Sequence, residues 1–145
     1  MTSAVEPRPD QIAAFSALPA HETIHMLNLL RFREVADYPT DHPDHGKRVS
    51  GRAAYGTYGT AVEAHLARVG ARVVWTGRPD CVLIGPTDER WDAALIVEYP
   101  GGEAFLRMVM DPGYIDIARH RTAALADSRL VRMKPVTMSQ LLAGT

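Results

Sequence analysis

Cysteine is nearly absent from this chain of 145 residues, since Cys81 is the only one. No disulfide can form within one chain, and no pair of thiols is available for redox exchange or for a thiolate zinc site. We therefore expect a cytoplasmic protein.

An excess of charge is also missing: 16 Lys and Arg face 17 Asp and Glu, which leaves a net charge of about −1. Such a chain has no overall field that would gather phosphates or anionic lipids, so we expect no nucleic-acid or membrane partner. The first residues lack the basic start and apolar run of a secretion signal, and no segment approaches 18 uncharged apolar residues.

The signatures of common cofactor and nucleophile sites are missing too. The chain contains no GxGxxG, GxxxxGK[ST], GxSxG or HExxH, so nothing supports dinucleotide binding, P-loop chemistry, a hydrolase elbow or a zincin site. We expect no bound cofactor.

The segments that are present predict one α+β domain. Strand patterns occur at 23–33, 71–85, 91–99 and 128–136, and the second of these is interrupted or bulged at the turn Arg78-Pro79-Asp80. A helix pattern at 52–69 follows the first strand, and a second helix, interrupted at Asp111-Pro112, lies between the last two strands. This order is that of the ferredoxin-like βαββαβ sandwich with a four-stranded antiparallel sheet. We expect it over residues 21–136, after an N-terminal helical extension over 1–20 in which Asp10 caps the helix, and before a tail over 137–145.

The first strand is apolar on both faces, because Leu27 and Leu29 alternate with Ile24, Met26 and Leu30. Two helices cover only one face of such a sheet, so the other face needs a second cover. Pairing of two sheets in a homodimer would supply it. The alternative is that the N-terminal helix folds under the sheet.

Several segments resemble a known bacterial family. They are NLLRF at 28–32, AYGTYG at 54–59, IGPTDERWD at 84–92, VEYPGGEAFLRM at 97–108 and DPGYIDIARHRTAALADSRL at 111–130. Over residues 22–132 the chain is similar to the domain-of-unknown-function family 1330, of the dimeric α/β-barrel superfamily. The resemblance implies the ferredoxin-like fold and a face-to-face dimer, and it implies no reaction.

The second helix carries the best candidate site. Tyr114, Ile117 and Arg121 share one stripe, and an arginine on an inward stripe needs an anionic partner. Arg121 can therefore hold a substrate carboxylate or enolate oxygen, with Tyr114 adding a hydrogen bond. The alternative is a structural salt bridge from Arg121 to Glu98 on the neighbouring strand.

His120 is the best candidate for acid and base catalysis, because imidazole titrates near neutral pH. Asp116, one helical turn earlier, is placed to orient it. The alternative is an ordinary solvated histidine with an aspartate partner.

Further candidates line the same predicted pocket. Asn28 is the polar residue on an apolar strand face and must bond to backbone or to a ligand. Tyr55 belongs to an aromatic group that lines either a site or only the core. The loop motif Asp41-His42-Pro43-Asp44-His45 offers metal donors, but nothing in the sequence fixes their geometry, so we expect no metal site.

These residues predict a small-molecule-handling protein: a cofactor-independent isomerase, cyclase or monooxygenase that transfers a proton on a carbonyl or carboxylate compound. His120 and Arg121 would be catalytic, and Asn28, Tyr55, Tyr114 and Glu98 would bind substrate. The alternative is a dimeric protein that binds a metabolite or is purely structural. The 34–51 segment, long for a loop, is expected to cover a site or to be disordered.

Overall fold

A computed structural model describes residues 3–144 of the chain. Its elements follow in the order α1 (Pro9–Ser16), β1 (Ile24–Phe32), α2 (Gly51–Arg68), β2 (Arg72–Gly77), β3 (Ala93–Tyr99), α3 (Gly102–Val109), α4 (Pro112–Ala124), β4 (Leu125–Met133) and α5 (Met138–Leu142). Within this part of the chain, no helix is long and apolar enough to cross a membrane.

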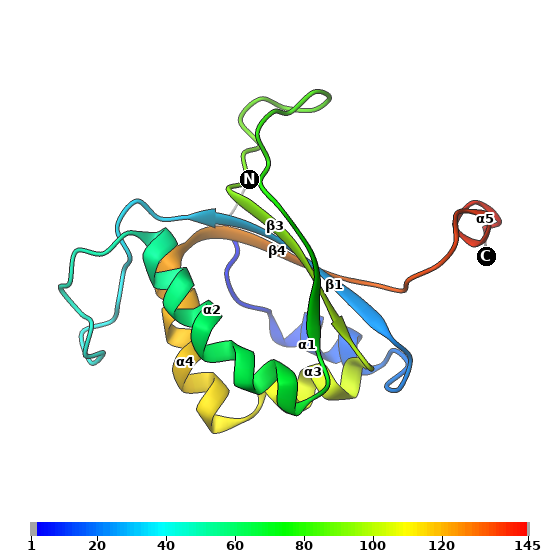
Figure 1. The fold of residues 1–145 in the computed structure, drawn as a ribbon, viewed down its shortest axis with the longest axis horizontal. Coiled ribbons are helices and arrows are strands. Elements are labelled where there is room, and N and C mark those ends of the chain that lie inside the picture. Colours follow the sequence, from blue (N-terminus) through cyan, green and yellow to red (C-terminus); the bar gives the residue numbers. More distant parts are fainter. Residues whose placement is uncertain (1–2, 145) are drawn as a thin grey trace.

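The four strands form one antiparallel sheet in the order β2-β3-β1-β4. Helices α1 to α4 lie together on one side of this sheet (Figure 1). The prediction of a ferredoxin-like α+β fold is confirmed.

Local signals in the sequence explain where the helices begin and end. The Ser50 side chain accepts a hydrogen bond from the Ala53 N–H at the start of α2, and Gly70 ends that helix with φ of 77°. Between α3 and α4, the Asp111 side chain accepts from the N–H groups of Gly113 and Tyr114. Pro112 cannot continue α3 but suits the first turn of α4. The predicted interruption of the helix at Asp111-Pro112 is confirmed.

Three details of the element prediction were wrong. The apolar run after Cys81 does not continue β2: it belongs to a loop in which Leu83 and Ile84 are almost fully exposed. β4 begins directly after α4, three residues earlier than predicted. Asp10 lies inside the first turn of α1 and pairs with Arg8, because Pro9 takes the first helical position.

The helix-covered face of the sheet holds the core. Ile24, Met26 and Leu30 of β1 point to this side, and Leu30 is 0% exposed. Helix α1 contributes Phe15, whose ring centroid lies 5.1 Å from that of Phe105 in α3. The alternative in which the N-terminal helix covers the other face of the sheet was therefore wrong.

That other face, which we call the open face, bears side chains of all four strands. The strand register places Leu27, Leu29, Ile96, Trp75 and Val131 at its centre. Trp75 is 51% exposed and Val131 is 47% exposed. Among the described residues, no helix packs over these side chains (Figure 1).

Candidate functional site

The loop between β1 and α2 docks against the C-terminal end of α4. The N–H groups of Arg33 and Asp37 donate to the carbonyls of Ala124 and Ala123 at 2.8 and 2.9 Å. These bonds satisfy carbonyls that the end of a helix leaves free. Gly51 allows the close approach, because a Cβ there would lie 2.3 Å from the Arg33 carbonyl oxygen.

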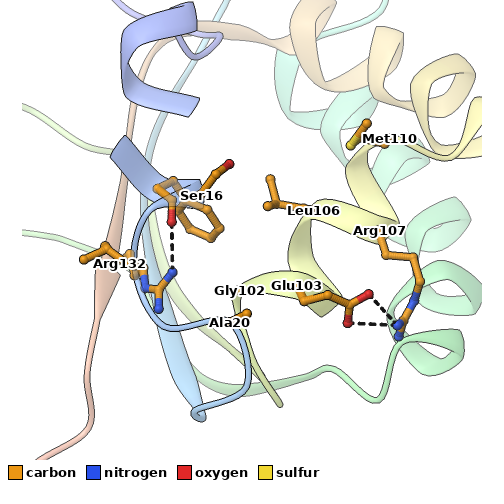
Figure 2. Close-up of a pocket in the computed structure, with 10 residues that line it drawn as sticks. Ser16, Ala20, Gly102, Glu103, Leu106, Arg107, Met110 and Arg132 are labelled. Atoms are coloured by element: carbon orange, nitrogen blue, oxygen red, sulfur yellow. Dashed lines mark hydrogen bonds and ion pairs between the residues drawn. The ribbon is translucent and has the colours of Figure 1, made fainter. Parts of the chain in front are cut away.

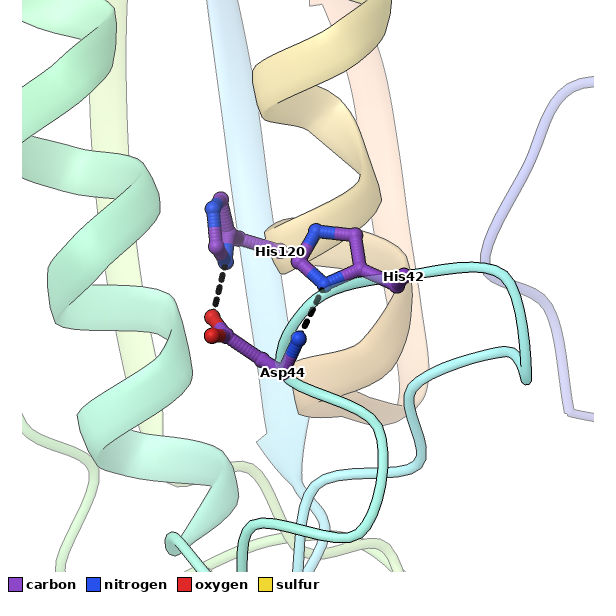
Figure 3. Close-up of side chains that lie close together, drawn as sticks. All are labelled: His42, Asp44 and His120. Atoms are coloured by element: carbon purple, nitrogen blue, oxygen red, sulfur yellow. Dashed lines mark hydrogen bonds and ion pairs between the residues drawn. The ribbon is translucent and has the colours of Figure 1, made fainter.

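This docking brings three loop residues to His120 of α4. We call Tyr38, His42, Asp44 and His120 the His120 cluster (Figure 3 shows His42, Asp44 and His120). The Tyr38 Oη lies 2.6 Å from Nδ1 of His120. The His42 ring stacks on Tyr38 at 4.6 Å and meets His120 edge-on at 5.1 Å between centroids. The loop thus lies over His120.

The cluster is largely sheltered from water, since Tyr38 is 5% and His42 is 8% exposed. Burial lowers the pKa of His120, with a further decrease from His42, while Asp44 and Asp116 act in the opposite direction. Burial raises the pKa of Tyr38, and the negative charge of Asp44 adds to this. The hydrogen bond from Lys47 lowers the pKa of Asp44. The buried pair therefore favours a neutral imidazole beside a neutral phenol.

The partner of His120 differs from the one expected. Asp116 was predicted to orient the ring, yet Nδ1 is held by Tyr38, with Asp44 Oδ2 at 3.9 Å. When the neutral ring carries its proton on Nε2, the Tyr38 O–H donates to Nδ1. Sequence reasoning missed Tyr38 because 82 residues separate it from His120 and no helical or strand spacing links the two.

Three members of the cluster offer metal donors. Each of His42, Asp44 and His120 offers one ligand atom, a ring nitrogen or a carboxylate oxygen, and these three atoms lie within 4.8 Å of one another. The sequence argument against a metal in this loop was that nothing fixes the geometry of its donors. Helix α4 supplies such a donor in His120.

Arg121, predicted to lie beside the same site, points elsewhere. Its Nη1 donates to the Val5 carbonyl at 2.8 Å, and the neighbouring Thr122 donates to Glu6 at 2.9 Å. The Ala4 carbonyl accepts a bond from Ser128 at 2.8 Å. Arg121 thus ties the N-terminal segment to α4, and Ser128 ties it to β4.

The alternative pairing of Arg121 with Glu98 was wrong. The register His25↔Glu98 turns the Glu98 side chain to the open face, across the sheet from α4. There Glu98 accepts from His25 at 3.0 Å and from Arg72 at 3.3 Å. These contacts lower the pKa of Glu98, with His25 the larger cause.

The remaining predicted residues lie between the sheet and the helices. Asn28 donates to the Met26 carbonyl at 3.1 Å, which favours its backbone-bonded alternative. The hydroxyls of Tyr114 and Tyr58 lie 3.0 Å apart, and Tyr55 packs on Phe32 with 5.5 Å between centroids. Burial is the main cause that raises the pKa of Tyr55 and Tyr58. The structure therefore separates the predicted site into the His120 cluster, Arg121, this tyrosine group and Glu98.

A surface groove lies in another part of the molecule, between α1 and α3 (Figure 2). It has a volume of about 340 Å³. Its lining is mainly apolar and includes Phe15, Leu18, Leu106 and Met110, with Arg132 on one side. None of the six predicted site residues is part of this lining.

The sheet order and the two helical crossovers define a ferredoxin-like α+β protein. The chain belongs to the family described as domain of unknown function DUF1330, whose sequence profile matches residues 46–134. The resemblance stated from the sequence is therefore confirmed.

Solved structures agree with this assignment. RPA0582 of Rhodopseudomonas palustris, a protein of unknown function, is 41% identical over 94% of this chain and 99% of that chain, with a TM-score of 0.84. Methylated RPA0582 is 43% identical over 95% and 98%, with a TM-score of 0.87. An uncharacterised NIPSNAP domain protein of Burkholderia xenovorans shares the fold at 12% identity over 80% and 96%, with a TM-score of 0.51. No curated protein matches the chain.

Proposed function

We propose that this chain is a cytoplasmic, homodimeric enzyme that transfers a proton on a small carbonyl or carboxylate compound without a bound cofactor. The observation that carries the proposal is the 2.6 Å contact between Tyr38 Oη and Nδ1 of His120 beneath the docked loop. A phenol and an imidazole in direct contact form a pair that can give and accept protons in turn.

The surroundings of the pair support this role. His120 is mostly buried, so a proton that it carries is exchanged with a bound molecule more readily than with bulk water. Isomerisation, cyclisation and oxygen-dependent oxidation of a carbanion share such a step. Arg121 is bound to the Val5 carbonyl, so anion binding by Arg121 would require the N-terminal segment to move away.

A second candidate is a non-catalytic metabolite-binding or structural protein. It is favoured by the fact that, among residues 3–144, no buried side-chain nitrogen or oxygen lacks a hydrogen-bond partner. A fully satisfied cluster can serve simply to hold the loop on α4.

Exchange of substrate protons with solvent separates the two candidates. We would incubate the metal-free protein in D₂O with a panel of small ketones and 2-oxo acids, and follow deuterium incorporation by ¹H NMR. Tyr38→Phe and His120→Ala should slow any catalysed exchange by roughly 10²- to 10⁴-fold, whereas His21→Ala, an exposed histidine before β1, should not. Folded variants that exchange as fast as wild type would refute the enzyme role.

The homodimer is supported by the open face. Its apolar centre of Leu27, Leu29, Ile96, Trp75 and Val131 is bordered at one end by the polar side chains of His25, Glu98 and Arg72. An apolar centre with a polar rim is the usual composition of a protein interface. A second copy of the same face is the partner that the dimer requires.

A further inference from the structure

The His120 cluster combines two imidazoles and a carboxylate from two parts of the chain. His42 and Asp44 come from the loop, and His120 comes from the last turns of α4. Figure 3 shows the Asp44 carboxylate turned toward the His120 ring, with the His42 ring beside both. Donors that converge from a helix and a docked loop are held in place better than donors within one free loop.

The orientation of Asp44 leaves one oxygen available. Oδ1 accepts from Lys47 at 2.8 Å, whereas Oδ2 faces Nδ1 of His120 at 3.9 Å. His42 is fixed by its stacking on Tyr38 and by a hydrogen bond of 3.0 Å from the Asp44 N–H to its Nδ1. The cluster therefore offers one carboxylate oxygen and two ring nitrogens around one point.

We propose that His42, Asp44 and His120 bind a divalent transition ion of the zinc class, in competition with the Tyr38–His120 hydrogen bond. Two imidazoles and one carboxylate suit Zn²⁺, Co²⁺ or Ni²⁺, whereas Mg²⁺ and Ca²⁺ prefer sites made of oxygen. An open fourth position would be left for water or for a small ligand.

Binding requires the cluster to contract. Zinc lies about 2.0–2.2 Å from nitrogen and oxygen ligands, so two ligands of a tetrahedral site are roughly 3.3–3.6 Å apart, whereas the three donors of the free cluster lie within 4.8 Å of one another. The loop residues His42 and Asp44 would have to move toward α4 by about 1 Å. In either tautomer the Asp44 N–H must release Nδ1 of His42, because this nitrogen would either bind the ion itself or carry the ring proton while Nε2 binds it.

The ion and Tyr38 compete for one lone pair. Nδ1 of His120 cannot coordinate a metal while it accepts the Tyr38 O–H. Insofar as the proposed proton transfer holds, a bound ion switches it off by occupying this nitrogen. The ion would then regulate the site that the proposed function uses.

Calorimetric titration of the tag-free, metal-stripped full chain with Zn²⁺ tests the proposal. We expect one ion per chain, and His42→Ala or Asp44→Asn should weaken binding by roughly 10- to 100-fold or more. Matched controls come from the same loop: His45→Ala and Asp41→Asn should bind Zn²⁺ as wild type does. No saturable binding, or equal losses in the controls, would overturn the proposal.

Two further readouts do not depend on activity. Co²⁺ should give the intense visible absorption of a four-coordinate site in wild type but not in Asp44→Asn. Tyr38→Phe should bind Zn²⁺ more tightly, because the competing O–H is gone, although it should lose any catalysed proton exchange. Weaker binding in Tyr38→Phe would refute the competition. Ion binding without exchange in the wild type would count against the proposed function alone.

Discussion

The two faces of the sheet contain similar residues but have different surroundings. Leu30 on the covered face has no exposed area, whereas Trp75 and Val131 on the open face are about half exposed. Both faces of β1 are apolar because Leu27 and Leu29 alternate with Met26 and Leu30. Burial by the helices of the same chain thus explains only one half of the apolar residues in this strand.

The difference shows that the sequence of β1 is suited to two kinds of contact. Its even-numbered residues stabilise the folded chain, and its odd-numbered residues are available to a partner. Neighbouring substitutions can therefore separate folding from association, since Leu29 and Leu30 are adjacent but point to opposite faces.

Truncation on the covered face should have the largest effect on folding. Leu30→Ala leaves a cavity where the side chain is fully buried, so we expect a loss of about 2–5 kcal/mol in the free energy of unfolding. Urea denaturation at one protein concentration, followed by circular dichroism, measures it. A loss below about 1 kcal/mol would mean that the core relaxes around the site.

A charge on the open face should instead act on association. Leu29→Asp places a carboxylate at the centre of the proposed interface, so we expect monomers at concentrations where the wild type sediments as a dimer. The control is Ile115→Asp, at an exposed apolar position of α4, which should leave the sedimentation coefficient unchanged. A monomeric wild type, or a dimeric Leu29→Asp, would contradict the dimer.

The same contrast explains how much of the fold could be predicted. Alternation in β1 and the break at Pro112 are local signals, and both predictions are confirmed. The cap at Ser50 and the glycine at 70 are local signals of the same kind. The run after Cys81 is as apolar as a strand, yet it pairs with no other strand within the described residues. Its exposure is a matter of tertiary structure, and hydrophobicity alone did not reveal it.

The site was harder to predict because its contacts are distant in sequence. Helical spacing places Tyr114 and Arg121 on one stripe of α4, but their partners, Tyr58 and Val5, depend on how other segments dock. Arg121 meets Val5, 116 residues away, and His120 meets Tyr38, 82 residues away. Glu98 was assigned to the wrong face because the register of β3 against β1 was unknown.

Alkaline pH should lower the stability of the folded chain through the buried tyrosines on the covered face. Burial raises the pKa of Tyr58 and Tyr99, so in the folded chain both remain neutral at a pH where the unfolded chain ionises them. A raised pKa contributes stability below the unfolded value of about 10 and withdraws it as the pH rises toward the folded value. We expect the free energy of unfolding to decrease above about pH 10, and less steeply in Tyr58→Phe. Equal slopes for wild type and variant, measured by urea denaturation, would contradict this.

Acid pH should lower the stability through Glu98 on the open face, by less than alkaline pH does through the buried tyrosines. The hydrogen bond with His25 and the charge of Arg72 hold the pKa of Glu98 below its usual range. A lowered pKa contributes stability at pH above the pKa of the unfolded chain, and this stability is lost as the pH falls toward the folded pKa, because the unfolded chain binds the proton first. Glu98→Gln should therefore show a shallower decrease of the unfolding midpoint between about pH 5 and pH 3 than the wild type. The control Asp80→Asn, at an exposed loop position, should match the wild type.

Since Glu98 lies at the edge of the proposed interface, the difference between Glu98→Gln and the wild type should increase with protein concentration if acid also weakens the dimer. A concentration-independent difference would restrict the role of Glu98 to one chain.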